Sequence, residues 1–219
     1  MAKADRALRT DGEVTYHRIL EAAGELFAAT GYAETTSKQI AVGAGVDVAS
    51  INYHFGSRKG LYQAVLVEAH RRVISIDFLQ QLVASDLEAE DKLKRIIELL
   101  VETAVGHHGW HMRVLSRELL SPSSNVEVLQ QTEILPKLPL VLTIFSEITS
   151  IPKDDSALLR CLISVLAPCT MLLVAGRSLS RVTTGIFSTP RDILVEHLYQ
   201  FSIGGLEAIV RDYENRDAP

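Results

Sequence analysis

The sequence has 219 residues, of which 47% are hydrophobic and 22% are charged, which is the balance of a folded globular protein rather than of a disordered chain. Lys and Arg together number 22 and Asp and Glu 27, so the formal charge is −5. This excludes a chain coated in basic charge for nonspecific nucleic-acid binding, but it leaves room for a small basic surface with its own local charge.

Apolar residues recur at helical spacing through almost the whole chain, and no alternating strand pattern with a hairpin turn is found. The sequence therefore predicts an all-α fold. Residues 1–12 are expected to form a flexible basic arm. Helices are expected over residues 13–30, 37–44, 48–54, 57–82, 91–105, 110–120, 154–176 and 190–213, with a further segment from residue 125 that Pro136 and Pro139 interrupt or kink.

The two cysteines and the first twelve residues bear on the compartment. Cys161 and Cys169 lie in an apolar run, and residues 1–12 contain no apolar signal-peptide core, so we expect a cytoplasmic protein with two buried thiols. The most apolar segment, 157–176, includes Arg160, and its uncharged part is shorter than the about 20 residues that cross a bilayer. This favours a buried helix over a membrane span.

Residues 36–54 have the pattern of a helix-turn-helix. Thr36 with Gln39 three residues later forms a capping box, Gly45 suits a tight turn, and Asp47 can cap the following helix. Ile40, Ala41, Val46 and Ile51 are expected to face inward, which leaves Val48, Ala49, Ser50, Asn52, Tyr53 and His54 on the outer side of the second helix.

Those outer residues are of types that read or hold DNA. A helix fits the major groove, which is about 12 Å wide; Asn pairs with adenine, and Ala or Val contacts a thymine methyl group. Tyr and His suit phosphate or sugar contacts, and the first N–H groups of the preceding helix, near Ser37 and Lys38, can hold a phosphate. Two short helices joined by glycine also occur in many helical proteins, so spacing alone leaves a purely structural hairpin open.

Residues 19–66 resemble the N-terminal domain of TetR-family transcriptional regulators, through the phrases TTSKQIA, AGV and INYHFGSRKGLY at the family's order and spacing. The resemblance implies a three-helix DNA-binding head, a larger helical C-terminal domain and a homodimer. It also implies DNA contacts at Thr36, Ser37, Lys38, Val48, Ala49, Ser50, Asn52, Tyr53, His54 and Arg58, with Phe55 packing the recognition helix onto the head. Asn52 replaces a usual aromatic residue, which puts the base preference in doubt. Arg58-Lys59 replaces a common Lys-Glu, which adds a cation near the phosphates.

The C-terminal part resembles the YbiH/CecR subgroup more weakly, through SRELLSPS at residues 116–123 and FGSRKGLY at residues 55–62. We therefore expect three parts: the arm over 1–12, a helix-turn-helix DNA-binding domain over 13–60, and a helical ligand-binding and dimerisation domain over 61–219.

Candidate ligand-binding residues lie around residue 110: His107, Trp110, His111, Arg113 and Arg117. His107 and His111 have a spacing that can bind zinc, but Gly106 and Gly109 break the helix there, so a polar helix junction involving His108 is favoured and no metal site is expected. Arg113 and Arg117 form a like-charge i,i+4 pair that either a ligand carboxylate or an acid elsewhere in the chain would relieve. Trp110 suits either a pocket wall or the core.

No nucleophile elbow, phosphate loop or metal motif accompanies these residues, so we expect no enzyme and no cofactor. The last two helices are apolar on most sides, with Gly204, Gly205 and Ala208 allowing close approach, which predicts a homodimer through these helices; burial within one chain is the alternative. The sequence thus predicts a one-component repressor that a small molecule releases from a near-palindromic operator. An inducer-free architectural or cell-division factor, and a helical enzyme or ligand carrier, are the alternatives.

Overall fold

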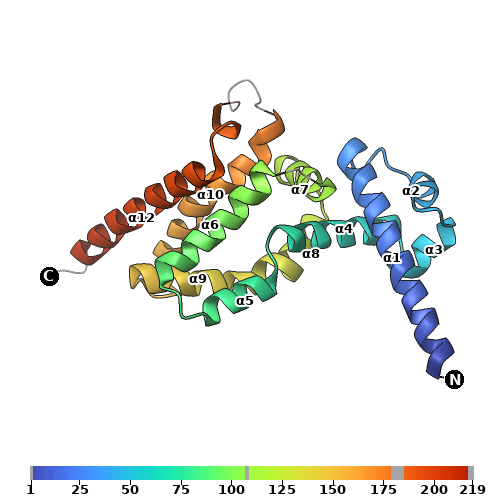
Figure 1. Cartoon of the computed structure of the whole chain (residues 1–219), viewed down its shortest axis with the longest axis horizontal. Coiled ribbons are helices and arrows are strands. Elements are labelled where there is room, and N and C mark those ends of the chain that lie inside the picture. Colours follow the sequence, from blue (N-terminus) through green and yellow to red (C-terminus); the bar gives the residue numbers. More distant parts are fainter. Residues whose placement is uncertain (1, 107–108, 179–184, 217–219) are drawn as a thin grey trace. The chain divides into compact units, whose positions relative to one another are not determined.

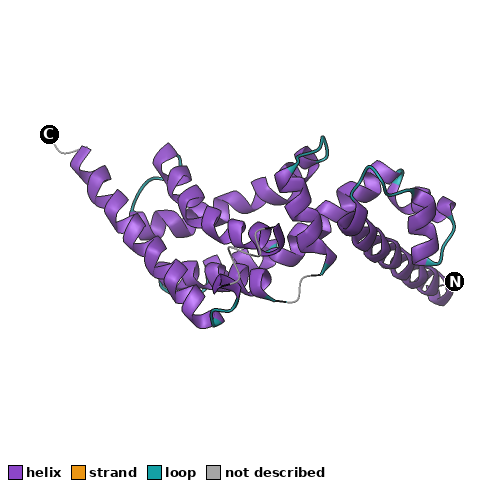
Figure 2. Cartoon of the chain, turned by 90° about the horizontal axis from the view of Figure 1, so that it is seen from above, coloured by secondary structure: helices purple, strands orange, loops and turns teal. Residues whose placement is uncertain are grey.

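The computed structural model describes residues 2–106, 109–178 and 185–216, and within these ranges it contains helices but no strand (Figure 2). The predicted all-α fold is therefore confirmed. In chain order the elements are α1 (Ala2–Thr30), α2 (Ser37–Ala44), α3 (Val48–Phe55), α4 (Arg58–Val73), α5 (Ile76–Ala84), α6 (Ala89–Val105), α7 (Trp110–Leu120), α8 (Val126–Leu129), the π-helix η1 (Gln130–Ile134), α9 (Leu135–Thr149), α10 (Ser156–Ser178) and α12 (Arg191–Arg216) (Figure 1).

The chain forms two compact units. Unit 1 comprises Met1–Arg72 and Gly109–Thr132, and unit 2 comprises Val73–His108 and Glu133–Pro219. Packing thus assigns α4 and α7 to the same unit as the helix-turn-helix. The expected boundary after residue 60 concerns which part binds DNA and which part binds a ligand, and it stays a prediction.

The core of unit 1 is built from one apolar stripe of each helix. Ile19 and Phe27 of α1, Ile40 of α2, Ile51 of α3 and Leu61 of α4 are all fully buried in one cluster, which also includes Trp110 and Val114 of α7. The predicted inward residues of the helix-turn-helix are confirmed: Ile40, Ala41 and Ile51 are buried and Val46 packs against the cluster. Burying these side chains removes apolar surface from water and fixes α3 on the head.

Unit 2 is organised around α6 and α10. On α6 the buried apolar residues recur at helical spacing and form one stripe: Leu93, Ile96, Ile97, Leu100, Val101 and Ala104. On α10, Leu158, Cys161, Val165 and Cys169 recur at helical spacing and are buried, and the two cysteines are free thiols, as predicted. Burial raises the pKa of the Cys169 thiol to about 11, so this sulfur stays protonated at neutral pH.

By length and composition alone, Ser156–Val174 of α10 is the one helix among the described residues that could cross a membrane. Core helices of soluble proteins pass the same test, and the buried stripe of α10 packs within unit 2.

Two expectations about helix ends were wrong. The structure continues α1 as helix back to Ala2, whereas the sequence predicted a helix start near Glu13; a flexible arm over residues 1–12 stays a prediction. The segment before Gly12 is rich in Ala, Lys, Arg and Leu, which are good helix formers and allow this extension. The long helix expected over 57–82 is divided into α4 and α5, because the Ser75 hydroxyl accepts a hydrogen bond from the Phe78 N–H at 3.1 Å and starts a new helix.

The interruption predicted at Pro136 and Pro139 takes the form of a π-helix. η1 leads directly into α9, where Pro136 occupies the first turn and Pro139 lies inside the helix. Glu133 of η1 pairs with Lys137 at 2.7 Å, both side chains being buried, and Lys137 also donates to the Ile74 carbonyl at 2.7 Å. The extra residue of the π-turn thus coincides with a buried ion pair inside unit 2.

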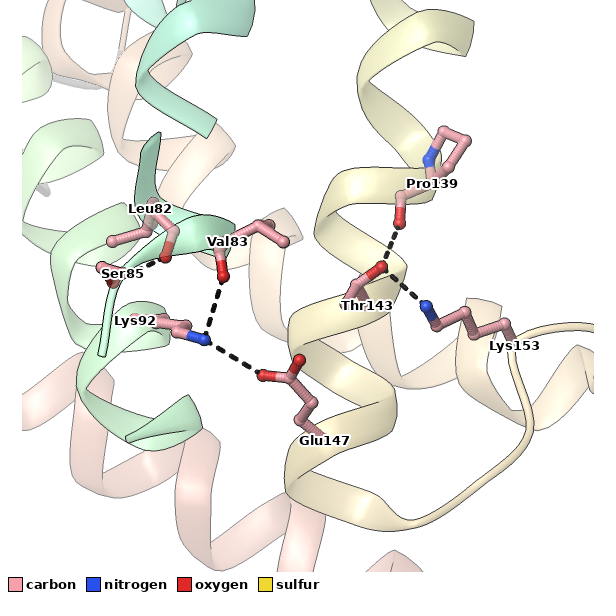
Figure 3. A network of polar contacts seen from close by, with 8 residues as sticks. All are labelled: Leu82, Val83, Ser85, Lys92, Pro139, Thr143, Glu147 and Lys153. Carbon is pink, nitrogen blue, oxygen red and sulfur yellow. Dashed lines mark hydrogen bonds and ion pairs between the residues drawn. The ribbon is translucent and has the colours of Figure 1, made fainter. Parts of the chain in front are cut away.

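A second buried lysine joins α5, α6 and α9 (Figure 3). Lys92 is only 6% exposed; its Nζ donates to the Val83 carbonyl at 3.2 Å and lies 3.4 Å from a Glu147 carboxylate oxygen. The cation therefore satisfies a carbonyl in the last turn of α5, where the helix dipole favours positive charge. This network fixes the scaffold of unit 2 and accounts for a lysine on the inner face of α6.

Candidate nucleic-acid interface

The capping box predicted at the start of α2 is present. The Thr36 hydroxyl accepts from the Gln39 N–H at 3.2 Å, and the Gln39 Oε1 accepts from the Thr36 N–H at 2.8 Å. Thr36 and Lys38 are exposed and Ser37 is half-buried. A capped helix N-terminus with a lysine beside it is an arrangement that can bind phosphate.

The turn between α2 and α3 is held by main-chain hydrogen bonds. Gly45, where the sequence predicted a tight turn, adopts the left-handed conformation with φ of +63°, and the Val46 N–H donates to the Ala41 carbonyl at 3.0 Å. Arg18 of α1 reaches this turn and donates through Nη2 to the Ala44 carbonyl and, at 3.1 Å, to the Gly45 carbonyl. The turn is thus tied to α1 as well as to α2.

The N-terminus of α3 is capped by Asp47, as predicted. Its Oδ1 accepts from both the Ser50 N–H and the Ser50 hydroxyl at 2.7 Å. These hydrogen bonds lower the pKa of the Asp47 carboxyl below its ordinary value of 3.8. With Ile51 buried below and Asp47 closing the end, α3 keeps one orientation on the head.

The outer face of α3 remains open to solvent. Val48, Ala49 and Asn52 are exposed, Tyr53 is 85% exposed, and Ser50 and His54 are half-buried. A tyrosine exposed to this degree contributes little to the core of its own chain. The structure therefore leaves four of the six predicted α3 residues exposed and two half-buried, and DNA contacts by them stay a prediction.

Phe55 has the structural position that the resemblance implied. Its ring stacks on Tyr16 of α1, with centroids 4.6 Å apart and planes 25° apart. The His54 ring lies 6.1 Å from Tyr16 and 5.0 Å from Tyr53, both edge-on. This aromatic group holds the C-terminal end of α3 against α1.

Arg58, predicted to contact phosphate, lies at the first position of α4. Its Nη1 donates to the Tyr32 carbonyl at 2.8 Å and to the Thr35 carbonyl, and its guanidinium lies 4.3 Å from the centre of the Tyr32 ring. The side chain is thus half-buried against the loop between α1 and α2. A phosphate contact by Arg58 stays a prediction.

The candidate ligand residues of α7 contact α1 within unit 1. The Trp110 Nε1 donates to a Glu21 carboxylate oxygen at 2.7 Å, Arg113 pairs with Glu25, and Arg117 donates to the Ala28 and Ala29 carbonyls at 3.2 and 3.0 Å. His111 is half-buried beside Trp110, and His107 and His108 lie outside the described residues. Ligand binding by this group stays a prediction, and the structure supplies partners on α1 for its two arginines.

A buried polar network in unit 1 was not anticipated from the sequence. The Tyr62 hydroxyl donates to Glu118 Oε2 at 2.9 Å, and Glu118 Oε1 accepts from both the N–H and the hydroxyl of Ser123 at 2.8 Å. Burial, together with Glu118, raises the pKa of Tyr62, so the phenol remains a donor. The two phrases that carried the CecR resemblance meet here, since Tyr62 closes one and Glu118 and Ser123 lie in the other. The similarity of these two phrases to the CecR subgroup was visible in the sequence, but nothing in the sequence indicated that their residues are in contact.

A capped helix-turn-helix with a solvent-facing second helix, joined to a long helical region, defines a DNA-binding transcriptional regulator. Residues 19–65 match the family model described as bacterial regulatory proteins of the tetR family, and residues 89–206 match the C-terminal domain of the HTH-type transcriptional dual regulator CecR. The chain belongs to the TetR family, and its C-terminal region is of the CecR type, as the weaker resemblance suggested.

Curated relatives match over part of their length. The chain is 35% identical to the HTH-type transcriptional regulator SrpR of Pseudomonas putida over 77 residues, which are 35% of this chain and 36% of SrpR. It is 23% identical to UidR of Escherichia coli strain K12 over 107 residues, 43% of this chain and 55% of UidR. The chain thus spans about a third to about half of the length of these relatives.

Solved structures match over most of the chain. The fatty acid degradation regulator FadR from Bacillus halodurans aligns with a TM-score of 0.66 at 20% identity, covering 88% of this chain and 96% of that one. FadR from Bacillus subtilis, solved in complex with stearoyl-CoA, aligns with a TM-score of 0.62 at 17% identity, covering 87% and 98%. At such identities the likeness concerns the fold.

Proposed function

We propose that this protein is a homodimeric, cytoplasmic, one-component repressor without enzymatic activity, which binds a near-palindromic operator and is released by a small molecule. The observation that carries the proposal is the outer face of α3, where side chains suited to reading bases are exposed although the helix itself is firmly anchored by Ile51 and Asp47.

In the proposed complex, α3 enters the major groove. Asn52 pairs with a base edge, while Val48 and Ala49 contact thymine methyl groups and Ser50 serves a neighbouring base. The phosphate and sugar contacts come from Thr36, Ser37 and Lys38 at the N-terminus of α2, and from Tyr53 and His54 at the far end of α3. The phosphate contacts set the register, and the α3 contacts supply the sequence preference.

Dimerisation through α10 and α12 is supported by apolar side chains that their own unit leaves uncovered. On α10, Leu159, Ile163 and Met171 are exposed on one face at multiples of four residues, and on α12 Ile193 and Phe201 are exposed. A Cβ atom at Gly204 or Gly205 would meet open space, so a partner helix has room to approach. Apolar faces of this length are typical of an interface, and a two-fold axis would bury both helices of each protomer.

The effector would act by favouring a state of the dimer whose two heads do not match successive major grooves. The shift is limited by the difference in the ligand's affinity for the two states. In this proposal the candidate residues His107, Trp110, His111, Arg113 and Arg117 line or border the ligand site. Three of them contact α1, so a ligand that competed for those contacts would act on the unit that carries α3.

Selection of bound duplexes from a random DNA pool tests the proposal. We expect enrichment of a palindrome whose half-sites are centred about one helical turn, or 34–36 Å, apart. Footprinting upstream of the gene for this protein then locates the operator. Enrichment of sequences without two-fold symmetry would refute dimeric operator binding. Loss of operator protection when a DNA-free metabolite extract is added would support release by a small molecule.

A further inference from the structure

Two arginines from different helices bind the two ends of α2. Arg58 of α4 donates to the Tyr32 and Thr35 carbonyls in the loop before α2, and Arg18 of α1 donates to the Ala44 and Gly45 carbonyls where α2 ends. Each arginine therefore uses one terminal nitrogen to join two main-chain oxygens that are far from it in sequence.

The loop that Arg58 holds determines where α2 begins. Thr35 is only 1% exposed, and its hydroxyl donates to the Gly31 carbonyl at 2.7 Å and lies 2.9 Å from the Thr30 hydroxyl. Carbonyls in a loop packed this closely need donors, since an unpaired buried carbonyl is costly. Arg58 supplies those donors to the residue directly before Thr36, the cap of the proposed phosphate-binding helix end.

The position of Arg58 is unfavourable for a cation unless it has such partners. It is the first residue of α4, and positive charge at a helix N-terminus opposes the helix dipole. The Tyr32 ring, over which the guanidinium carbon lies, and the two carbonyls offset this by giving the cation favourable partners. At the other end of α2, a Cβ on Gly45 would lie 2.9 Å from Arg18 Nη2 and would displace the end of that side chain, and the left-handed φ of +63° independently favours glycine.

We propose that Arg58 and Arg18 are positioning residues for DNA binding: they hold the two ends of α2 so that its N-terminus and α3 meet the phosphates and the bases at the same time. Their contribution to affinity passes through Thr36–Lys38 and the α2–α3 turn rather than through contacts of their own with DNA. The proposal rests on the DNA interface of α2 and α3 proposed above.

A double-mutant cycle between Arg58→Ala and Lys38→Ala separates positioning from direct phosphate binding. If Arg58 acts through the start of α2, Arg58→Ala weakens DNA binding strongly in the wild-type background and much less in the Lys38→Ala background. The expected coupling between the two substitutions is at least about fivefold in Kd. The slope of log K against log salt then changes no further when Arg58→Ala is added to Lys38→Ala. An independent phosphate contact would instead give additive losses, with a further fall in slope of about 0.9 per protomer.

Amide hydrogen exchange of the DNA-free protein supplies a readout that does not depend on DNA. We expect Arg58→Ala to accelerate exchange over residues 35–39, and Arg18→Ala to accelerate it at Gly45 and Val46, whose N–H groups are hydrogen-bonded in the turn. Lys59→Ala is the matched control, because it removes the neighbouring exposed cation and should leave exchange in both segments unchanged.

Arg58→Lys is a second variant that keeps the test valid if Arg58→Ala unfolds the protein. It keeps the charge, which would suffice for a phosphate contact, but it loses the planar group that lies against Tyr32, so we expect most of the loss of loop protection to remain. Wild-type exchange in both arginine-to-alanine variants, or additive losses in the cycle, would overturn the proposal. If the wild-type protein itself lacked selective DNA binding, the exchange experiment would still decide whether the arginines hold α2.

Discussion

Replacing Asn52 by alanine isolates the base-reading function of α3. Asn52 is exposed, whereas α3 is held by Ile51 in the core and by the Asp47 cap, so truncation leaves the supports of the helix in place. A bidentate asparagine–adenine pair contributes about 1–3 kcal/mol of discrimination. A dimer carries two such pairs, so the expected loss at the cognate operator is about 2–6 kcal/mol, or about 30-fold to about 20,000-fold in Kd.

Fluorescence anisotropy with a set of operators measures this loss. Each operator differs from the selected sequence by one symmetric base-pair change, and salt is held constant because affinity depends steeply on it. We expect the wild-type protein to discriminate strongly at one base pair per half-site, and Asn52→Ala to bind all four bases there with similar affinity. Thermal unfolding of the DNA-free variant should match that of the wild type.

Three results would refute this reasoning. If Asn52→Ala retained the base preference of the wild type at every position, Asn52 would not be a base reader. If it weakened binding to all operators equally, its side chain would contact the sugar–phosphate backbone instead. A large fall in the melting temperature would show that Asn52 supports the fold, which its exposure argues against.

Four further predictions address the interface, the core and the dimer. Lys38→Ala should weaken binding to all sequences alike and reduce the salt slope by about 0.9 per protomer, measured by anisotropy over a salt series. Because the folded-state pKa of Asp47 is lowered, its stabilisation of α3 is present above the ordinary value of 3.8 and is lost as pH falls through the folded value; exchange of the Ser50 amide should accelerate there, and not in Asp47→Asn. Gly24→Ala places a Cβ 2.3 Å from the Trp110 ring, so calorimetry should show destabilisation of about 1–3 kcal/mol. Phe201→Asp should give monomers by analytical ultracentrifugation with an unchanged circular dichroism spectrum, because Phe201 is 69% exposed in the single chain.

The helix-turn-helix could be predicted from the sequence because its determinants are local. The Thr36–Gln39 capping box, the tight turn at Gly45 and the Asp47 cap all act within a few residues, and each is present in the structure. The inward stripe of Ile40 and Ile51 followed from helical periodicity in the same way. Signals of this kind need no knowledge of the rest of the chain.

The division of the expected 57–82 helix was missed for the opposite reason. Ser75 is a common residue, and whether it caps a new helix depends on how the flanking segments pack. The same holds for Arg58, whose carbonyl partners are 23 and 26 residues away in sequence. A cation next to a DNA-reading motif was therefore interpreted as a phosphate contact, although its visible partners lie within the protein.

The partners of the like-charge pair Arg113 and Arg117 affect how variants that no longer respond to an effector should be interpreted. Their spacing on α7 left a ligand carboxylate and an acid elsewhere in the chain as alternatives. In the structure Arg113 pairs with Glu25, and Arg117 donates to carbonyls at the C-terminal end of α1, where the helix dipole favours a cation. Both side chains therefore stabilise the packing of α1 against α7 in the unit that carries α3. A variant at either position that no longer responds to an effector has two explanations, loss of a ligand contact or a shifted α1. Only DNA affinity measured without the effector separates them, because a pure ligand contact leaves that affinity at the wild-type value.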